Sequence, residues 1–195
     1  MYAATPTATL ADLLPATRLR TAALVVGAAA LTAVCAQITV PVPGSPVPVT
    51  LQTFAVLLAG AGLGWRAGGA SQLLYLAVGA LGAPIYAGGD SGWASLTSAT
   101  GGYLVGFVLA AVAVGLLAER GHDRRIVTAV PAMLIGSAAV YLCGVTWLAH
   151  SMDWTATMAI DKGLTPYLVG DAVKLVVAGL LLPAAWALSG SDETP

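Results

Sequence analysis

Charged residues are scarce in this 195-residue chain. Asp, Glu, Lys and Arg together make up 9% of it, whereas hydrophobic residues make up 58%. Soluble domains carry about 25% charged residues, so the composition excludes an ordinary soluble domain and predicts an integral membrane protein. The net charge of −1 and the lack of basic runs exclude a nucleic-acid-binding surface.

Several catalytic motifs are also missing. The only lysines are Lys162 and Lys174, and neither follows a glycine, so the chain has no phosphate-binding loop for ATP hydrolysis. It contains no nucleophile elbow and no H-E-x-x-H pair. The two histidines, His122 and His150, have no cluster of further ligands at metal spacing. We therefore expect a protein that is not an enzyme and has neither cofactor nor metal.

The few charges divide the chain into apolar stretches, and a helix that crosses a membrane needs about 20 such residues. The stretches predict an all-α membrane protein with six transmembrane helices, in one domain (1–195) with flexible tails at 1–18 and 189–195. Arg66 indicates a tight connection between the second helix and the third, and Thr165 and Pro166 suit the cap and first position of the last. The six predicted helices span residues 21–40, 49–64, 67–81, 103–118, 126–149 and 166–188.

The connections between these helices differ on the two sides of the membrane. The side with residues 41–48, 82–102 and 150–165 has Lys162 as its only basic residue. Basic residues collect on the cytoplasmic side, so both termini are predicted in the cytoplasm, in the cytoplasmic membrane of a bacterium or archaeon. All the arginines fall on that side, at positions Arg18, Arg20, Arg66, Arg120, Arg124 and Arg125.

Asp171 and Lys174 are the only charged residues in the last apolar stretch. Each costs about 2.5–3.5 kcal/mol at the centre of a membrane, but at this spacing they share one helix face and can neutralise each other. Tyr167 extends the same polar stripe. The pattern predicts an outward-opening site within the membrane for a small polar molecule. An internal salt bridge that only fixes helix packing is the alternative.

The first apolar stretch contains small residues at four-residue spacing. Such residues let helices approach closely in lipid. They predict either packing within the bundle or a docking face for another membrane subunit, and periodicity alone leaves both open. The residues are Ala23, Gly27, Ala29 and Ala33.

Four segments give the chain a resemblance to a known family, the BioY proteins, which are biotin-specific substrate-binding (S) components of energy-coupling-factor transporters. The resemblance implies six helices, an outward-facing pocket closed by loops, and tight binding of biotin. It also implies a transmembrane coupling protein and two cytoplasmic ATPase subunits as partners, although some members occur without them, and it favours docking for the small residues of the first helix. The segments are residues 29–64, with PVPGSPVPVTLQTF; 75–89, YLAVGALGAPIYAGG; 100–107, TGGYLVGF; and 170–175, GDAVKL.

On this resemblance we assign roles in a biotin site. Asp171 can accept from the ureido N–H groups, and Lys174 can donate to the ureido carbonyl or neutralise the carboxylate tail. The amide of Gln52 can do both, with an interhelical hydrogen bond as its alternative. Tyr86 and Trp93 are expected to pack on the bicyclic ring, with a position in the aromatic belt of the membrane interface as the alternative for Trp93. Further candidate residues for the site are Tyr75, Tyr103 and Tyr167.

The chain departs from the family pattern at two places. Many members have a Gly-Pro pair before T-G-G-Y-L, where this chain has Ser98-Ala99. Asp90 follows the A-G-G sequence, where some members carry a basic residue that could face the biotin carboxylate. Two other functions stay open: a self-sufficient carrier of a small organic anion or vitamin precursor, and an intramembrane enzyme that acts on a lipid with Asp171 as base.

Overall fold

The fold is almost entirely helical. The computed structural model describes residues 9–15 and 17–189. The sequence predictions that fall outside these ranges concern the N-terminal and C-terminal tails. The long helices are α1 (Arg18–Ala36), α2 (Gln52–Ala80), α4 (Gly101–Ala118), α5 (Ile126–Ser151) and α7 (Leu168–Leu188). The short elements are α3 (Trp93–Thr97), α6 (Ala156–Gly163), the 3-10 segments η1 (Leu10–Leu13), η2 (Ala87–Gly89) and η3 (Thr165–Tyr167), and strands β1 (Thr39–Val40) and β2 (Val49–Thr50).

The α2 segment consists of two helices joined by a sharp turn. The backbone leaves the helical conformation at Gly64 (φ 77°, ψ 174°), a left-handed region that favours glycine. A Cβ added to Gly68 would lie 2.8 Å from the Cα of Gly60. Residues eight apart in a straight helix are about 12 Å apart, so the two halves fold back against each other. The predicted tight connection next to Arg66 is confirmed.

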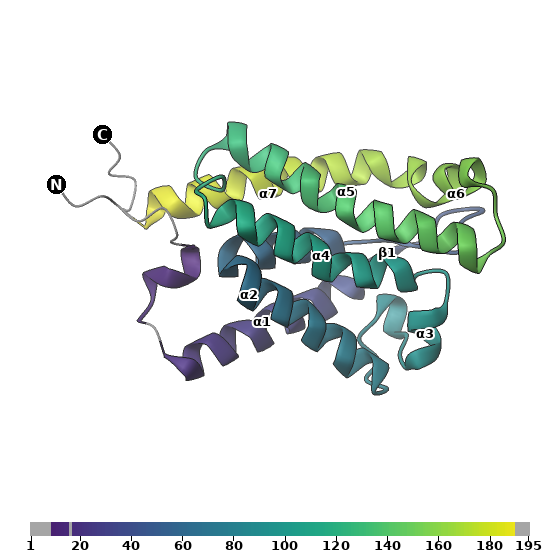
Figure 1. The fold of residues 1–195 in the computed structure, drawn as a ribbon, viewed down its shortest axis with the longest axis horizontal. Coiled ribbons are helices and arrows are strands. Elements are labelled where there is room, and N and C mark those ends of the chain that lie inside the picture. The colour runs from purple at the N-terminus through teal and green to yellow at the C-terminus, as the bar shows by residue number, and fades with distance from the viewer. Residues whose placement is uncertain (1–8, 16, 190–195) are drawn as a thin grey trace.

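Six membrane helices therefore form the bundle: α1, the two halves of α2, α4, α5 and α7 (Figure 1). Within the described residues, four stretches are long and apolar enough to cross a membrane by themselves: α1, α4, α5 and residues 156–188. The halves of α2 are each shorter than the roughly 20 residues of a full span, as the short apolar stretches predicted. The predicted fold class is confirmed.

Small residues allow the helices at the centre of the bundle to pack closely. A Cβ added to Gly60 would lie 2.6 Å from the carbonyl oxygen of Ala111 in α4. One added to Gly115 would lie 2.4 Å from the backbone nitrogen of Trp65. In lipid, such close backbone contact replaces the hydrophobic driving force as the source of helix association. The α2 hairpin and α4 form the core on this basis.

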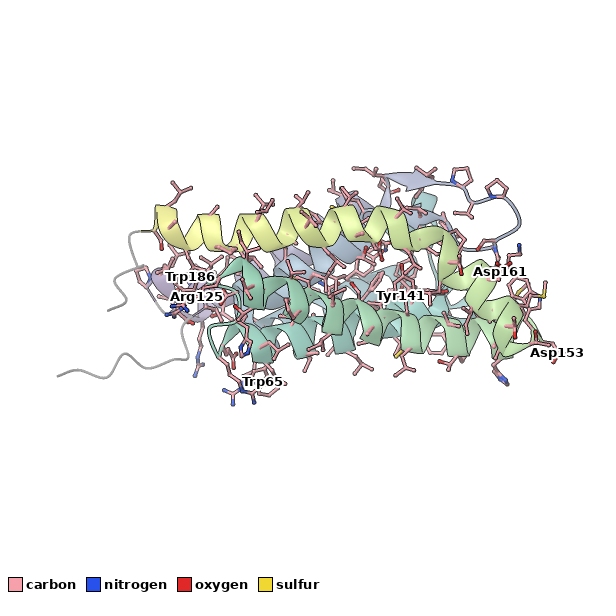
Figure 2. All side chains as sticks on the ribbon, turned by 90° about the horizontal axis from the view of Figure 1, so that it is seen from above. Trp65, Arg125, Tyr141, Asp153, Asp161 and Trp186 are labelled. Atoms are coloured by element: carbon pink, nitrogen blue, oxygen red, sulfur yellow. The ribbon has the colours of Figure 1, made fainter. Side chains whose placement is uncertain are left out.

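The two ends of the bundle differ in composition. We call the end with η1, the Gly64 turn, the α4–α5 connection and the end of α7 the arginine end, and the end with β1–β2, α3 and α6 the loop end (Figure 1). Figure 2 shows Arg125 at the first end and Asp153 and Asp161 at the other, with Tyr141 between them. The predicted separation of the arginines from the long connections is therefore present in the fold.

Several predicted boundaries were wrong. Val40 and Val49 belong to a small antiparallel hairpin in which they are partners, because the prolines between them end both helices. Thr165 does not cap the last helix: its hydroxyl donates to the Ile160 carbonyl, and α7 begins at Leu168 after a 3-10 turn that contains Pro166. Part of the predicted N-terminal tail forms η1, where Thr9 and Asp12 make a capping box.

Candidate functional site

A cavity of about 350 Å³ lies at the loop end of the bundle. Its volume falls within the roughly 300–1,000 Å³ of small-molecule sites. The wall combines apolar and aromatic side chains with one charged pair. It is lined by Pro46, Val47, Pro48, Thr50, Gln52, Thr53, Tyr86, Ala87, Asp90, Ser95, Ser98, Ala99, Thr100, Tyr103, Leu104, Phe107, Val140, Tyr141, Tyr167, Asp171 and Lys174.

Asp171 and Lys174 form a buried ion pair in the cavity wall. The Lys174 Nζ donates to Asp171 Oδ1 at 2.7 Å, and the exposed fractions of the two side chains are 12% and 8%. Asp171 lies in the first turn of α7, where the helix dipole favours a negative charge. The remaining ammonium donors go to the Thr50 carbonyl (2.7 Å) and the Thr53 hydroxyl (3.2 Å). The predicted pair is therefore a network that extends to the start of α2.

The sequence analysis missed Tyr141, which completes this network. Its hydroxyl donates to Asp171 Oδ2 at 2.5 Å from the middle of α5, and its ring lines the cavity. It also missed Thr53, whose hydroxyl lies 3.5 Å from Asp171 Oδ1. A tyrosine far from either end of an apolar helix is outside the interface belts that tyrosines usually occupy, and that position was the available signal for Tyr141.

Gln52 and Tyr75 are joined behind the cavity surface. The Gln52 amide donates to the Tyr75 hydroxyl at 2.7 Å and accepts from the Thr50 hydroxyl at 2.9 Å. The Tyr75 hydroxyl then donates to the Ile85 carbonyl at 3.0 Å. Gln52 lines the cavity, but Tyr75 does not. Tyr75 is thus placed to orient Gln52 across the α2 hairpin rather than to contact a ligand.

Three other predicted aromatic residues line the cavity and tie its walls together. The Tyr86 hydroxyl donates to the Leu76 carbonyl (2.6 Å), and the Tyr103 hydroxyl donates to the Gly163 carbonyl (2.8 Å). The Tyr167 hydroxyl donates to the Val47 carbonyl (2.5 Å), which holds the proline-rich segment against the start of α7. These contacts fix the wall at three points, and those of Tyr103 and Tyr167 join distant parts of the chain.

Trp93 lies outside the cavity. Its side chain is 71% exposed and does not line the cavity. It is the first residue of α3, on the outside of the loop end. The chain reaches this position because the backbone turns just before it, at three glycines with positive φ: Gly88, Gly89 and Gly92. In contrast to Trp93, the residues at both departures from the family pattern line the cavity: Asp90, Ser98 and Ala99.

The small residues of α1 do not form one surface. Ala23 and Gly27 are exposed, and a Cβ added to Gly27 would have no neighbour within 4 Å. Ala29 is buried against the rest of the bundle, and Ala33 is half-buried. The expectation that all four form a docking face is therefore corrected for Ala29, which contributes to internal packing. Ala23 and Gly27 remain available to a partner.

The comparisons with known proteins agree with this architecture. The sequence matches the BioY family over residues 7–191. It is 40% identical over 152 residues to the probable biotin transporter BioY of Pyrococcus horikoshii, covering 78% of this chain and 87% of that protein. It is 33% identical over 183 residues to a biotin transporter of Lactococcus lactis, covering 91% and 96% of the two chains. Such relatives are named as transporters, which confirms that the chain is not an enzyme.

One solved structure shares the fold. It is the S-component for biotin from an ECF-type ABC transporter, with a TM-score of 0.79 and 22% sequence identity over 87% of this chain and 94% of the other. The family resemblance noted from the sequence is confirmed by the family match over residues 7–191. This protein belongs to the BioY family.

Proposed function

We propose that this protein binds biotin in the cavity at the loop end and mediates its uptake. The observation that carries the proposal is the Tyr141–Asp171–Lys174 network, a satisfied charge pair in the wall of a cavity of small-molecule size. Ionisable residues within a membrane are costly and mark functional sites by default. The names of the relatives supply the identity of the ligand.

The chemistry of the network suits the ureido ring of biotin, which has two N–H donors and one carbonyl acceptor. A carboxylate offers about four acceptor positions, and the contacts from Lys174, Thr53 and Tyr141 occupy three of those on Asp171. One position is left for a ureido N–H. The Lys174 ammonium can exchange its contact with Thr53, the longest of its three, for the ureido carbonyl. Phe107 and Tyr103 give the ring system an apolar surface.

The proposal extends to transport. By the positive-inside rule, the arginine end lies on the cytoplasmic side of the cell membrane. The cavity, at the opposite end, then opens outward. The chain acts as the substrate-binding subunit of an ECF-type transporter with a transmembrane coupling protein and two ATPases, as the likeness to an S-component supports. The exposed Ala23 and Gly27 on α1 offer close approach to the coupling protein.

The direct test is to purify the full chain in detergent and ask by mass spectrometry whether it carries biotin. Asp171→Asn and Lys174→Ala should each abolish retention while the fold stays intact. Removal of one partner of a buried pair destabilises a fold by about 3–5 kcal/mol, so melting curves must show that each variant is still folded. Loss of a charged hydrogen-bond partner of biotin costs about 1.5–3 kcal/mol, which corresponds to about a tenfold or larger loss of affinity. Trp93→Ala is the control and should retain biotin. A folded Asp171→Asn variant with unchanged affinity would show that the site is elsewhere.

A further inference from the structure

Asp90 places a second carboxylate in the wall of the cavity. Asp90 is exposed at the loop end, whereas Asp171 and Lys174 are largely buried. The loop that carries it is fixed, because the Tyr86 N–H donates to the Asp90 carbonyl at 3.0 Å and the Gly92 N–H donates to the Gly79 carbonyl at 2.7 Å. The Asp90 carboxylate itself has no hydrogen bond or ion pair to the described part of the chain. It is therefore held at the mouth of the cavity and is free to meet a ligand.

The charges around the cavity are unbalanced. Its lining residues supply two carboxylates and a single ammonium. Lys174 lies 2.7 Å from Asp171 and directs its other donors to Thr50 and Thr53. Among the described residues that line the cavity, no cation is left for an anionic ligand group. The mouth carries the uncommitted negative charge.

From this distribution we propose that Asp90 determines specificity for the tail of the ligand. The inference rests on the proposed function, in which the network at Asp171 holds the ureido ring and the tail points toward the mouth. A tail that ends in a carboxylate meets the like charge of Asp90. A tail that ends in an amide avoids this repulsion and can donate an N–H to Asp90. A tail that ends in an ammonium is attracted to the Asp90 carboxylate. The preferred substrate class is biotin linked through its carboxyl group as an amide.

Binding measurements on the full chain in detergent test this inference. The probes are biotin, the neutral biotinamide, and an amine-terminated biotinamide, each at low and high salt. We expect the wild type to bind the two amides more tightly than biotin. Asp90→Asn should strengthen biotin binding about two- to fivefold, the range for an exposed charge pair, with little effect on biotinamide. High salt should likewise strengthen the binding of biotin to the wild type, because it screens the repulsion between exposed charges.

Two further variants sharpen the test. Asp90→Lys should reverse the preference and favour biotin over both amides. Asp153→Asn is the matched control: Asp153 is an exposed acid at the same end that does not line the cavity, and asparagine tolerates its φ of 53°. It should leave all three affinities unchanged. If the wild type prefers biotin and Asp90→Asn leaves the ratio unchanged, the inference fails and the proposed function stands. If the wild type binds none of the probes, the proposed function fails with it.

Discussion

The side chain of Asp171 illustrates how this protein keeps a charge within a membrane. Its carboxylate receives an ammonium, a phenol and the end of a helix dipole, each from a separate part of the structure. A carboxylate with fewer donors would be driven to protonate or to leave the apolar region. The donors therefore hold a charged acceptor ready for the neutral ureido ring of the proposed ligand, and each of them should contribute to affinity.

Tyr141→Phe tests this contribution from outside the ion pair. The change keeps the ring and removes only the donor to Asp171 Oδ2. A hydrogen bond to a charged group contributes about 1.5–3 kcal/mol to the stability of the fold, so we expect the melting temperature to fall. Because Asp171 loses one of the groups that hold it in place, we also expect biotin to bind more weakly. Titration of the purified variant with biotin measures the effect. Equal affinities for variant and wild type would mean that the phenol is only a packing group.

Asp123 gives the α4–α5 connection a pH dependence. Burial raises the pKa of this carboxyl above its ordinary value, and the Trp186 N–H, which donates to its Oδ2, only partly opposes the shift. Its Oδ1 has no hydrogen-bond partner among the described residues. The folded protein thus binds this proton more tightly than the unfolded chain does. The stability that results is present at acid pH and is lost as the pH rises through the folded pKa.

Asp123→Asn should therefore stabilise the protein at neutral pH. The amide oxygen can still accept from Trp186, but no buried charge remains. A gain of about 1 kcal/mol would raise the melting temperature by about 2–4 °C for a chain of this size, and the gain should shrink as the pH is lowered toward 4. Melting curves in detergent from pH 4 to 8 provide the measurement. A lower melting temperature at pH 7 would mean that the ionised carboxylate is needed.

At the scale of elements, the α2 hairpin depends on glycines that admit neighbouring backbone. Gly60→Ala would place a Cβ 2.6 Å from the Ala111 carbonyl oxygen, and such overpacking costs about 1–3 kcal/mol. Gly62→Ala lies in the same helix and meets no atom within 4 Å, so it gains the helix propensity of alanine without a clash. We expect Gly60→Ala to lower the melting temperature and Gly62→Ala to leave it equal or higher. Equal effects of the two would argue against close packing on α4.

The helices were predictable from the sequence because a membrane leaves the backbone little choice. Every N–H and C=O in lipid must be paired within the chain, so apolar stretches bounded by charges become helices, and Arg66 marked the turn between the second and the third. The β1–β2 hairpin and α6 lie in the connections, where this constraint does not hold. The contact of Tyr141 with Asp171 joins α5 to α7 through two residues that are 30 positions apart in the sequence. Apolar stretches alone do not specify which faces of two helices meet, so that contact was not predictable.

At the scale of the whole molecule, the separation of charge between the two ends predicts one orientation. With the free thiols Cys35 and Cys143 replaced, single cysteines at Asp161 and at Arg120 report on opposite ends. A reagent that does not cross membranes should label Asp161→Cys in intact cells, and should reach Arg120→Cys only after permeabilisation. The reverse pattern would place the cavity toward the cytoplasm and contradict uptake from outside.

The position of Asp171, Lys174 and Tyr167 at one end of the chain has a consequence for biosynthesis. The last helix, α7, provides both members of the charge pair, and Tyr167 just before it provides the hydroxyl that holds the proline-rich segment. Membrane proteins leave the ribosome from the N-terminus onward, so five helices are inserted before the site acquires its charged residues. A product truncated ahead of Pro166 would lack both charged residues and, on the proposed function, could not hold biotin.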